Sequence, residues 1–133
     1  MVNKSKIYLE QEVVDVDIPY IASKFDDAEE LDECMRMVQK GLDLISRRPD
    51  LEGKPCEYEP LKSAGCRKAK VYSSRTLEIS RGVKPDLRII YRYNEEEETV
   101  RVDSIGFRQK MRPRPDDDPY SRAEKRTMER VSQ

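Results

Sequence analysis

Arginines recur in the second half of the chain in a pattern that could serve chemistry on a polyanion. They lie in and beside two short apolar runs, residues 87–93 and 100–107, which an acidic connector at 94–98 joins. Alternation of apolar and polar residues in each run is typical of a β-hairpin with one face for a core and a second face carrying arginine. A guanidinium stays charged at neutral pH and can bind two phosphate oxygens at once. We therefore predict a polyanion-binding face, with ordinary surface cations as the alternative interpretation.

The alternation assigns side chains of three expected strands to opposite faces. In the first arm of the hairpin, Leu87, Ile89, Tyr91 and Tyr93 oppose Arg88, Ile90 and Arg92. In the second arm, Val100, Val102 and Ser104 alternate with Arg101, Asp103 and Ile105. Residues 71–80 are predicted to form a further strand, with Leu77 and Ile79 inward and Thr76, Glu78 and Ser80 on the other face.

The charge distribution supports a basic face in the C-terminal half. The net charge is only −1. Residues 1–53 hold seven Lys or Arg against thirteen Asp or Glu, whereas residues 54–114 hold fifteen against nine. Clustered positive charge is typical of a protein that binds nucleic acid. Chance asymmetry in a highly charged chain is the alternative.

The composition excludes several kinds of site. The chain has no histidine, which rules out a His-dependent catalytic triad and a His-liganded zinc. Three cysteines at positions 34, 56 and 66 are an odd number, which favours packing residues in a reducing cytoplasm over disulfides. No apolar run reaches the length of a transmembrane helix, and no signal peptide is evident. We expect a cytoplasmic protein with no metal, no cofactor and no membrane association.

The expected architecture is a single α+β domain with a small antiparallel sheet in the order β-α-α-β-β-β, helices on one face and a short C-terminal helix. Its most distinct element is the helix 27–48, because Leu31, Cys34, Met35, Val38, Leu42 and Ile45 follow at helical spacing after an acidic, capping-type start. The remaining segments are a strand and lead-in (1–26, with the strand at 7–18), a long connection (49–69), a three-stranded meander (70–108) and an irregular tail with a short helix (109–133).

The segments 87–92, 102–108 and 120–126 resemble the C-terminal half of RelE/ParE-superfamily toxins, and the expected order of elements fits that family. The resemblance covers about residues 70–126. RelE-type members cut messenger RNA in the ribosomal A site without a metal, by attack of the 2′-hydroxyl on the neighbouring phosphate. The resemblance thus implies that RNA, the ribosome and a cognate antitoxin are partners. An alternative is a non-catalytic RelE-fold protein that binds an antitoxin, a gyrase-like target or nucleic acid. An unrelated small α+β domain is a third possibility.

The resemblance also assigns roles to individual side chains. It implies that Arg88, Arg108 and Tyr120 are catalytic, with Arg88 and Arg108 converging on one phosphate. Where the family has basic residues on the preceding strand, this chain would present Thr76, Glu78 and Ser80. Glu78 is then a candidate general base, as a carboxylate is in some relatives, with simple repulsion of RNA as the alternative. We expect Arg81, Lys84, Arg92 and Arg101 to bind substrate. Between Arg108 and Tyr120 the chain is roughly six residues longer than the short members.

Overall fold

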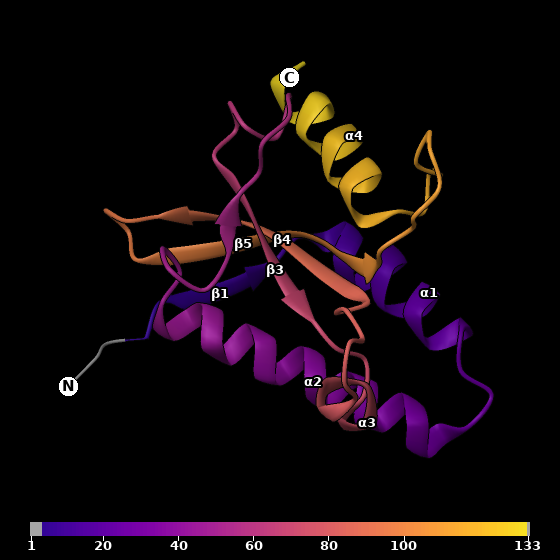
Figure 1. The fold of residues 1–133 in the computed structure, drawn as a ribbon. Coiled ribbons are helices and arrows are strands. Elements are labelled where there is room, and N and C mark those ends of the chain that lie inside the picture. The colour runs from indigo at the N-terminus through magenta and orange to yellow at the C-terminus, as the bar shows by residue number, and fades with distance from the viewer. Residues whose placement is uncertain (1–3, 133) are drawn as a thin grey trace.

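The computed structural model describes residues 4–132, which form an α+β domain around a five-stranded sheet in the order β1-β5-β4-β3-β2 (Figure 1). β1 runs parallel to β5, and the other neighbouring strands are antiparallel. The predicted class is confirmed, but the sheet is mixed rather than antiparallel throughout. The elements are β1 (Lys6–Leu9), a π-helical segment η1 (Val13–Asp17), α1 (Ile18–Ser23), α2 (Ala28–Arg47), β2 (Lys54–Pro55), β3 (Cys66–Val71), α3 (Arg75–Ile79), β4 (Leu87–Asn94), β5 (Thr99–Phe107) and α4 (Pro119–Val131).

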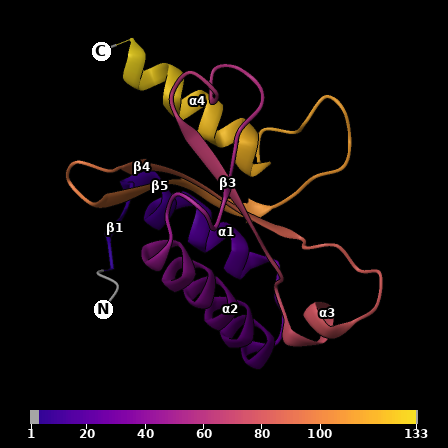
Figure 2. The ribbon, with the colours of Figure 1, turned by 60° about the vertical axis from the view of Figure 1, so that its left-hand side comes forward.

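Helices cover both faces of the sheet, as Figures 1 and 2 show. α2 lies on one face, over the main core, which includes Val38, Leu42, Ile45, Leu87, Ile89, Tyr91, Val100, Val102 and Ile105. α4 lies on the opposite face, over a smaller buried cluster of Cys56, Leu61, Cys66, Ile90, Tyr120 and Ala123. The sequence predicted helices on one face of the sheet only, with the other face open to a partner. That prediction is wrong where α4 covers the second face. The part of that face beyond α4 is where functional side chains can meet a partner.

α2 forms where its periodicity predicts. The Asp27 side chain caps it by accepting a hydrogen bond from the Glu29 backbone N–H at 2.7 Å, an interaction typically worth about 1 kcal/mol. Of the predicted stripe, Cys34, Val38, Leu42 and Ile45 are buried, while Leu31 and Met35 are half-buried. Neither α2 nor any other helix within residues 4–132 is long and apolar enough to span a membrane.

The predicted hairpin is confirmed, with a β-bulge that the alternation did not reveal. Leu87 pairs with Phe107 and Asn94 with Thr99, but the register shifts between Ile90 and Tyr91, leaving Asp103 as an extra residue on β5. An extra residue inverts the alternation beyond it. Ile105 consequently joins Val100 and Val102 in the main core, whereas the sequence pattern placed it on the arginine side.

The strand predicted at 71–80 is wrong in position. The strand that pairs with β4 is β3, which ends at Val71, and residues 75–79 form the short helix α3 instead. The Ser74 side chain caps α3 by accepting from the Leu77 backbone N–H at 3.1 Å. Since Ile79 is exposed, alternation in this segment does not reflect a buried sheet face. The cationic composition of β3 concealed a real strand within the predicted connection.

The strand predicted at 7–18 is confirmed only for its first part. After β1 the chain turns helical through η1 and α1, with Val13, Asp17 and Ile21 buried at helical spacing. The buried Asp17 carboxylate accepts a hydrogen bond from the Ile105 backbone N–H at 2.9 Å. This contact and the burial of the apolar residues favour a helix. The segment is therefore helical although the alternation of its valines predicted a strand.

Candidate functional site

Two lysines of β3 lie beside Arg88 on the α4 side of the sheet. Lys70 pairs with Arg88 in the strand register, and Lys68 pairs with Ile90, which is buried under α4. On the other side of β3, Lys54 of β2 pairs with Lys68. Since paired residues project to the same face, these strands bring three lysines and one arginine together. Sequence reasoning missed Lys68 and Lys70 because it assigned β3 to a connection. Alternation of Cys66, Lys68 and Lys70 with Ala69 and Val71 was the available signal.

Arg88 is a buried cation, and among residues 4–132 it has no carboxylate partner. Its side chain belongs to a residue only 3% exposed, and its Nη1 donates to the backbone oxygens of Pro85 and Leu87, each at 2.9 Å. Its Nε is buried and has no hydrogen-bond partner within residues 4–132. Burying a charge without a counter-ion typically costs several kcal/mol. Arg88 therefore maintains a positive potential beneath the surface that carries Lys70.

The positive surroundings of Lys70 alter its acidity. The charge of Arg88, followed by partial desolvation and then the charges of Lys54, Lys68 and Arg108, lowers the pKa of Lys70. The same interactions show that Arg108, which follows β5, contributes to the potential at Lys70. A lysine amine whose pKa is lowered is neutral in a larger fraction of molecules at neutral pH, and in that form it can accept a proton.

Tyr120 reaches this group of cations from the first turn of α4. The Asp118 carboxylate fixes its backbone by accepting from the N–H groups of Tyr120 and Gln109, each at 2.8 Å. The Arg114 guanidinium carbon lies 4.3 Å from the centre of the Tyr120 ring, and Lys68 Nζ lies 5.9 Å from it. The ring is thus covered, and Tyr120 is only 7% exposed.

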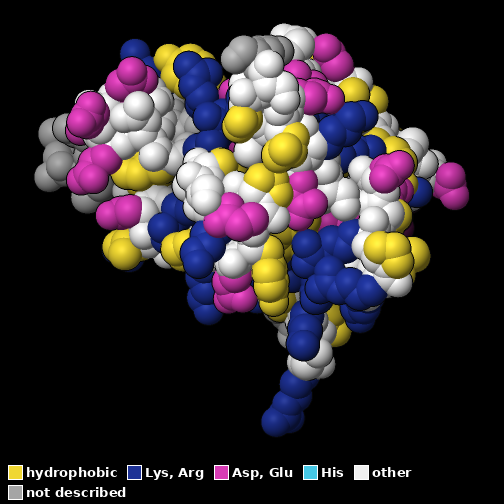
Figure 3. All heavy atoms as spheres, turned by 90° about the horizontal axis from the view of Figure 1, so that it is seen from above, with side chains coloured by type: hydrophobic (Ala, Val, Ile, Leu, Met, Phe, Trp, Pro, Cys, Tyr) yellow, Lys and Arg dark blue, Asp and Glu magenta, His cyan; other side chains and the backbone are white. Residues whose placement is uncertain are grey.

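We refer to Lys54, Lys68, Lys70, Arg88, Arg108 and Arg114 as the basic cluster. Within residues 4–132, none of these side chains forms a salt bridge. Figure 3, which views the molecule from the α4 side, shows Lys and Arg side chains gathered toward the lower part of that face. In a chain that contains as many acids as bases, an unneutralised group of six cations is suited to an anionic partner.

The other predicted site residues lie outside the basic cluster. Arg92 is paired with the buried Asp103 at 2.9 Å, and Arg101 approaches Glu10 at 3.7 Å. Arg81 and Lys84 are exposed in the loop between α3 and β4. Glu78 is on α3 rather than on the sheet, and it faces Lys40 of α2 at 3.7 Å. Arg88 and Arg108 thus lie around Lys70, Tyr120 lies beside Lys68, and Glu78 lies on α3 instead of the predicted strand.

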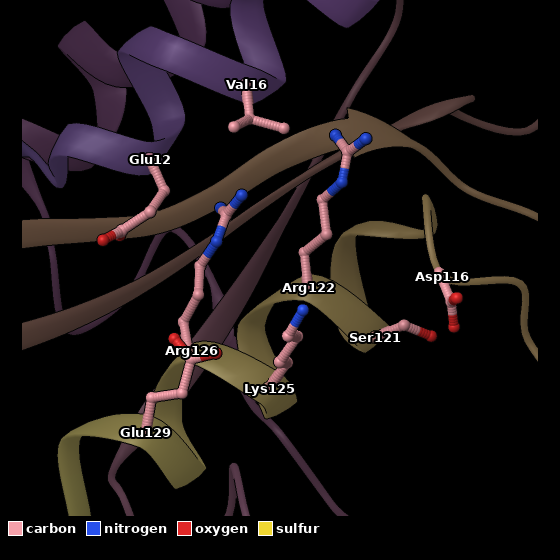
Figure 4. A pocket seen from close by; sticks show the side chains of 8 residues that line it. All are labelled: Glu12, Val16, Asp116, Ser121, Arg122, Lys125, Arg126 and Glu129. Carbon is pink, nitrogen blue, oxygen red and sulfur yellow. The ribbon is translucent and has the colours of Figure 1, made fainter.

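A second feature of the α4 face is a cavity of about 540 Å³ between η1 and α4 (Figure 4). Arg122 and Arg126 extend across it from α4 and bind Asp17, with nitrogen–oxygen distances of 3.2 and 2.7 Å. Glu12, Asp116 and Glu129 also line it, so its charge is mixed. We interpret this region as the attachment of α4 to the domain. Within residues 4–132 no group of three or more His, Cys, Asp or Glu residues is arranged to hold a metal ion.

Comparisons with known proteins identify the fold. No protein-family model and no curated protein matches the sequence. The toxin–antitoxin complex RelBE2 of Mycobacterium tuberculosis contains a chain that matches with 20% identity and a TM-score of 0.51, covering 81% of this chain and 95% of the other. A mutant of the E. coli toxin RelE in the free state matches with 18% identity and a TM-score of 0.51, covering 92% and 97%. The protein therefore has a RelE-like toxin fold.

Proposed function

We propose that the protein is a RelE-like toxin that cleaves messenger RNA on the ribosome without a metal ion. The observation that carries the proposal is the basic cluster, in which Lys70 lies beside a buried Arg88 and near Arg108. Cleavage of RNA at its own 2′-hydroxyl needs a proton acceptor and cations that stabilise a crowded, negatively charged phosphorane. The basic cluster contains candidates for both roles.

The proposed reaction assigns each step to a side chain. Neutral Lys70 accepts the proton of the 2′-hydroxyl, and the 2′-oxygen forms a bond to phosphorus. Arg108 and Lys68 bind the non-bridging oxygens, and Lys68 donates a proton to the departing 5′-oxygen. The products are a 2′,3′-cyclic phosphate and a 5′-hydroxyl. Arg88 acts from below by its charge, and Lys70 replaces Glu78 as the candidate base because Glu78 lies on α3 and faces Lys40 of α2.

A cognate antitoxin is the second expected partner. One structural neighbour was solved as a toxin–antitoxin complex, which supports an equivalent partner here. Since the basic cluster forms no salt bridge within the described residues 4–132, an acidic segment that covers it would neutralise the toxin by occupying the place of RNA. The partner should therefore present Asp or Glu to this face.

The test is cleavage of a defined message on programmed ribosomes, with the 5′ ends of the products mapped. Lys70→Ala should lower the rate about 10²- to 10⁴-fold, the usual contribution of a general base. Arg36→Ala is the matched control, because it removes an exposed cation from α2 on the opposite face. Equal rates for both variants would refute the assignment of Lys70. A wild-type protein that leaves the message intact on ribosomes and free in solution would refute the activity itself.

A non-catalytic binding protein is the second candidate function. It is favoured by the burial of Arg88 and by Arg114, which covers the Tyr120 ring. Such a protein would bind RNA or an acidic protein through the basic cluster but leave RNA uncut. Binding of RNA with a linear dependence of log affinity on log salt, without any cleavage, would support this candidate.

A further inference from the structure

The segment between β5 and α4 carries a cation at every second position from 108 to 114. Its cations are Arg108, Lys110, Arg112 and Arg114, and we call residues 108–114 the basic strap. Its base is fixed, because the Arg108 backbone N–H donates to the Asp86 oxygen and the Gln109 N–H donates to Asp118, each at 2.8 Å. Lys110, Met111 and Arg112 are exposed at its tip. The strap thus presents its cations on a backbone that is held at its start.

The acids that follow the strap do not neutralise it. Asp117 accepts a hydrogen bond from the Tyr20 hydroxyl, and Asp118 binds the backbone at the start of α4. Asp116 lines the cavity beside Arg122. Within residues 4–132, no carboxylate forms a salt bridge with any cation of the strap. Asp117 and Asp118 therefore hold parts of the fold together, while the neighbouring cations stay available.

Arg114 gives the strap a second property, a guanidinium plane held against an aromatic ring. Its guanidinium carbon lies over the Tyr120 ring, 4.3 Å from the ring centre, which is within the range of a cation–π interaction. Tyr120 is 7% exposed, so its ring has little free surface for a base. Arg114 is half-buried, so part of its side chain stays open to solvent. Nucleic-acid bases stack on guanidinium planes as well as on aromatic rings.

We propose that the basic strap is a binding element for single-stranded RNA, in which Lys110 and Arg112 bind phosphates and Arg114 stacks on a base with Tyr120 as its support. The ligand class rests on the proposed function, whereas the binding itself does not require cleavage. The strap continues from the basic cluster through Arg108 and Arg114, so one strand can contact both. RNA is favoured over an acidic protein because a stacked guanidinium offers a flat surface for a base beside the phosphate-binding cations.

The test uses a fluorescein-labelled oligouridylate with 2′-O-methyl riboses, which cannot be cleaved by 2′-hydroxyl attack. Its affinity is measured by fluorescence anisotropy from about 50 to 200 mM salt. For single strands the slope of log affinity against log salt is about −0.7 per phosphate contact. Lys110→Gln/Arg112→Gln removes two contacts and should make the slope less negative by about 1.4. Over this salt range the variant should therefore lose roughly sevenfold less affinity than the wild type.

Two further variants are needed. One tests whether the position of the removed charges matters, and the other tests whether the planar group matters when the charge is kept. Arg36→Gln/Arg48→Gln removes the same charge from exposed positions on and just after α2, and it should leave the slope unchanged. Arg114→Lys keeps the positive charge but lacks the planar guanidinium group. It should weaken binding of the oligonucleotide roughly fivefold or more, with the slope unchanged. Equal effects of the two double variants would overturn the proposal, as would a wild-type protein that does not bind the oligonucleotide. Binding by the strap without ribosomal cleavage would instead refute the proposed catalysis alone.

Discussion

Asp17 is the buried carboxylate that fastens α4 to the rest of the domain, and its replacement should be strongly destabilising. It is fully buried and accepts hydrogen bonds from the Ile105 backbone N–H, Arg122 and Arg126. Asp17→Ala leaves the buried Arg126 guanidinium without its carboxylate, although Arg126 still donates to the Asp103 backbone oxygen at 2.8 Å. Breaking a buried ion pair on one side typically costs about 3–5 kcal/mol.

The assay is equilibrium unfolding in urea, followed by circular dichroism. With a dependence on urea of about 1–3 kcal/mol per molar, a loss of this size lowers the unfolding midpoint by roughly 2 M. Most of the expected cost arises from the unpaired arginine, so Asp17→Ala/Arg126→Met should recover part of it. The interaction energy in this double-mutant cycle should be about 0.5–3 kcal/mol.

Two results would contradict this account of α4. A loss below about 1 kcal/mol in Asp17→Ala would mean that the ion pairs contribute little, as surface pairs do. A double variant no more stable than Asp17→Ala would mean that the cost comes from the lost hydrogen bond to Ile105 and not from Arg126. The conservative Asp17→Asn retains that acceptor and separates the two contributions.

Three other predictions concern acidity and the main core. Arg88→Met should raise the pKa of Lys70 by removing the largest contribution to its lowering, and an NMR titration of the lysine side-chain carbons in both proteins checks this. Burial, followed by the Asp103 charge, raises the pKa of the Cys66 thiol from 9.0 to about 12, so the thiol's contribution is complete below pH 9. Above pH 9 the thiol of the unfolded chain loses its proton while that of the folded protein keeps it. The free energy of unfolding of the wild type should therefore fall, relative to that of Cys66→Val, by about 1.4 kcal/mol per pH unit up to about pH 12. Urea unfolding at each pH measures this difference. Val38→Asp places an unpaired charge in the main core and should cost several kcal/mol; an unchanged melting temperature would mean that this side of α2 faces solvent.

Strong periodicity is what made the hairpin and α2 predictable. Both have apolar residues at the spacing of their secondary structure, and both end at clear polar or proline boundaries. β3 was not predictable in the same way, since three of its six residues, Arg67, Lys68 and Lys70, are cations. Residues 75–79 show the opposite case, because their alternation occurs in an exposed helical turn. Composition misled the assignment of β3, and alternation misled that of residues 75–79.

The candidate site was predictable only where local pattern and family resemblance coincide. Arg88, Arg108 and Tyr120 were named from the sequence, whereas Lys68 and Lys70, which lie next to Tyr120 and Arg88, were missed. The bulge at Asp103 depends on pairing with β4 and has no local signal. The burial of Arg88 depends likewise on carbonyl groups of the preceding turn. Both features depend on tertiary contacts, so the sequence of a single strand does not predict them.

The parallel pairing of β1 with β5 has a consequence for when the sheet can be completed during synthesis. Lys6 pairs with Thr99, so the edge of the sheet joins residues separated by most of the chain. Contacts of long sequence separation form slowly, and during synthesis β1 has no partner until β5 has left the ribosomal tunnel. The strap and Tyr120 follow β5 in the chain and emerge later still. The five-stranded sheet and the basic strap can therefore come together only after synthesis has passed residue 114.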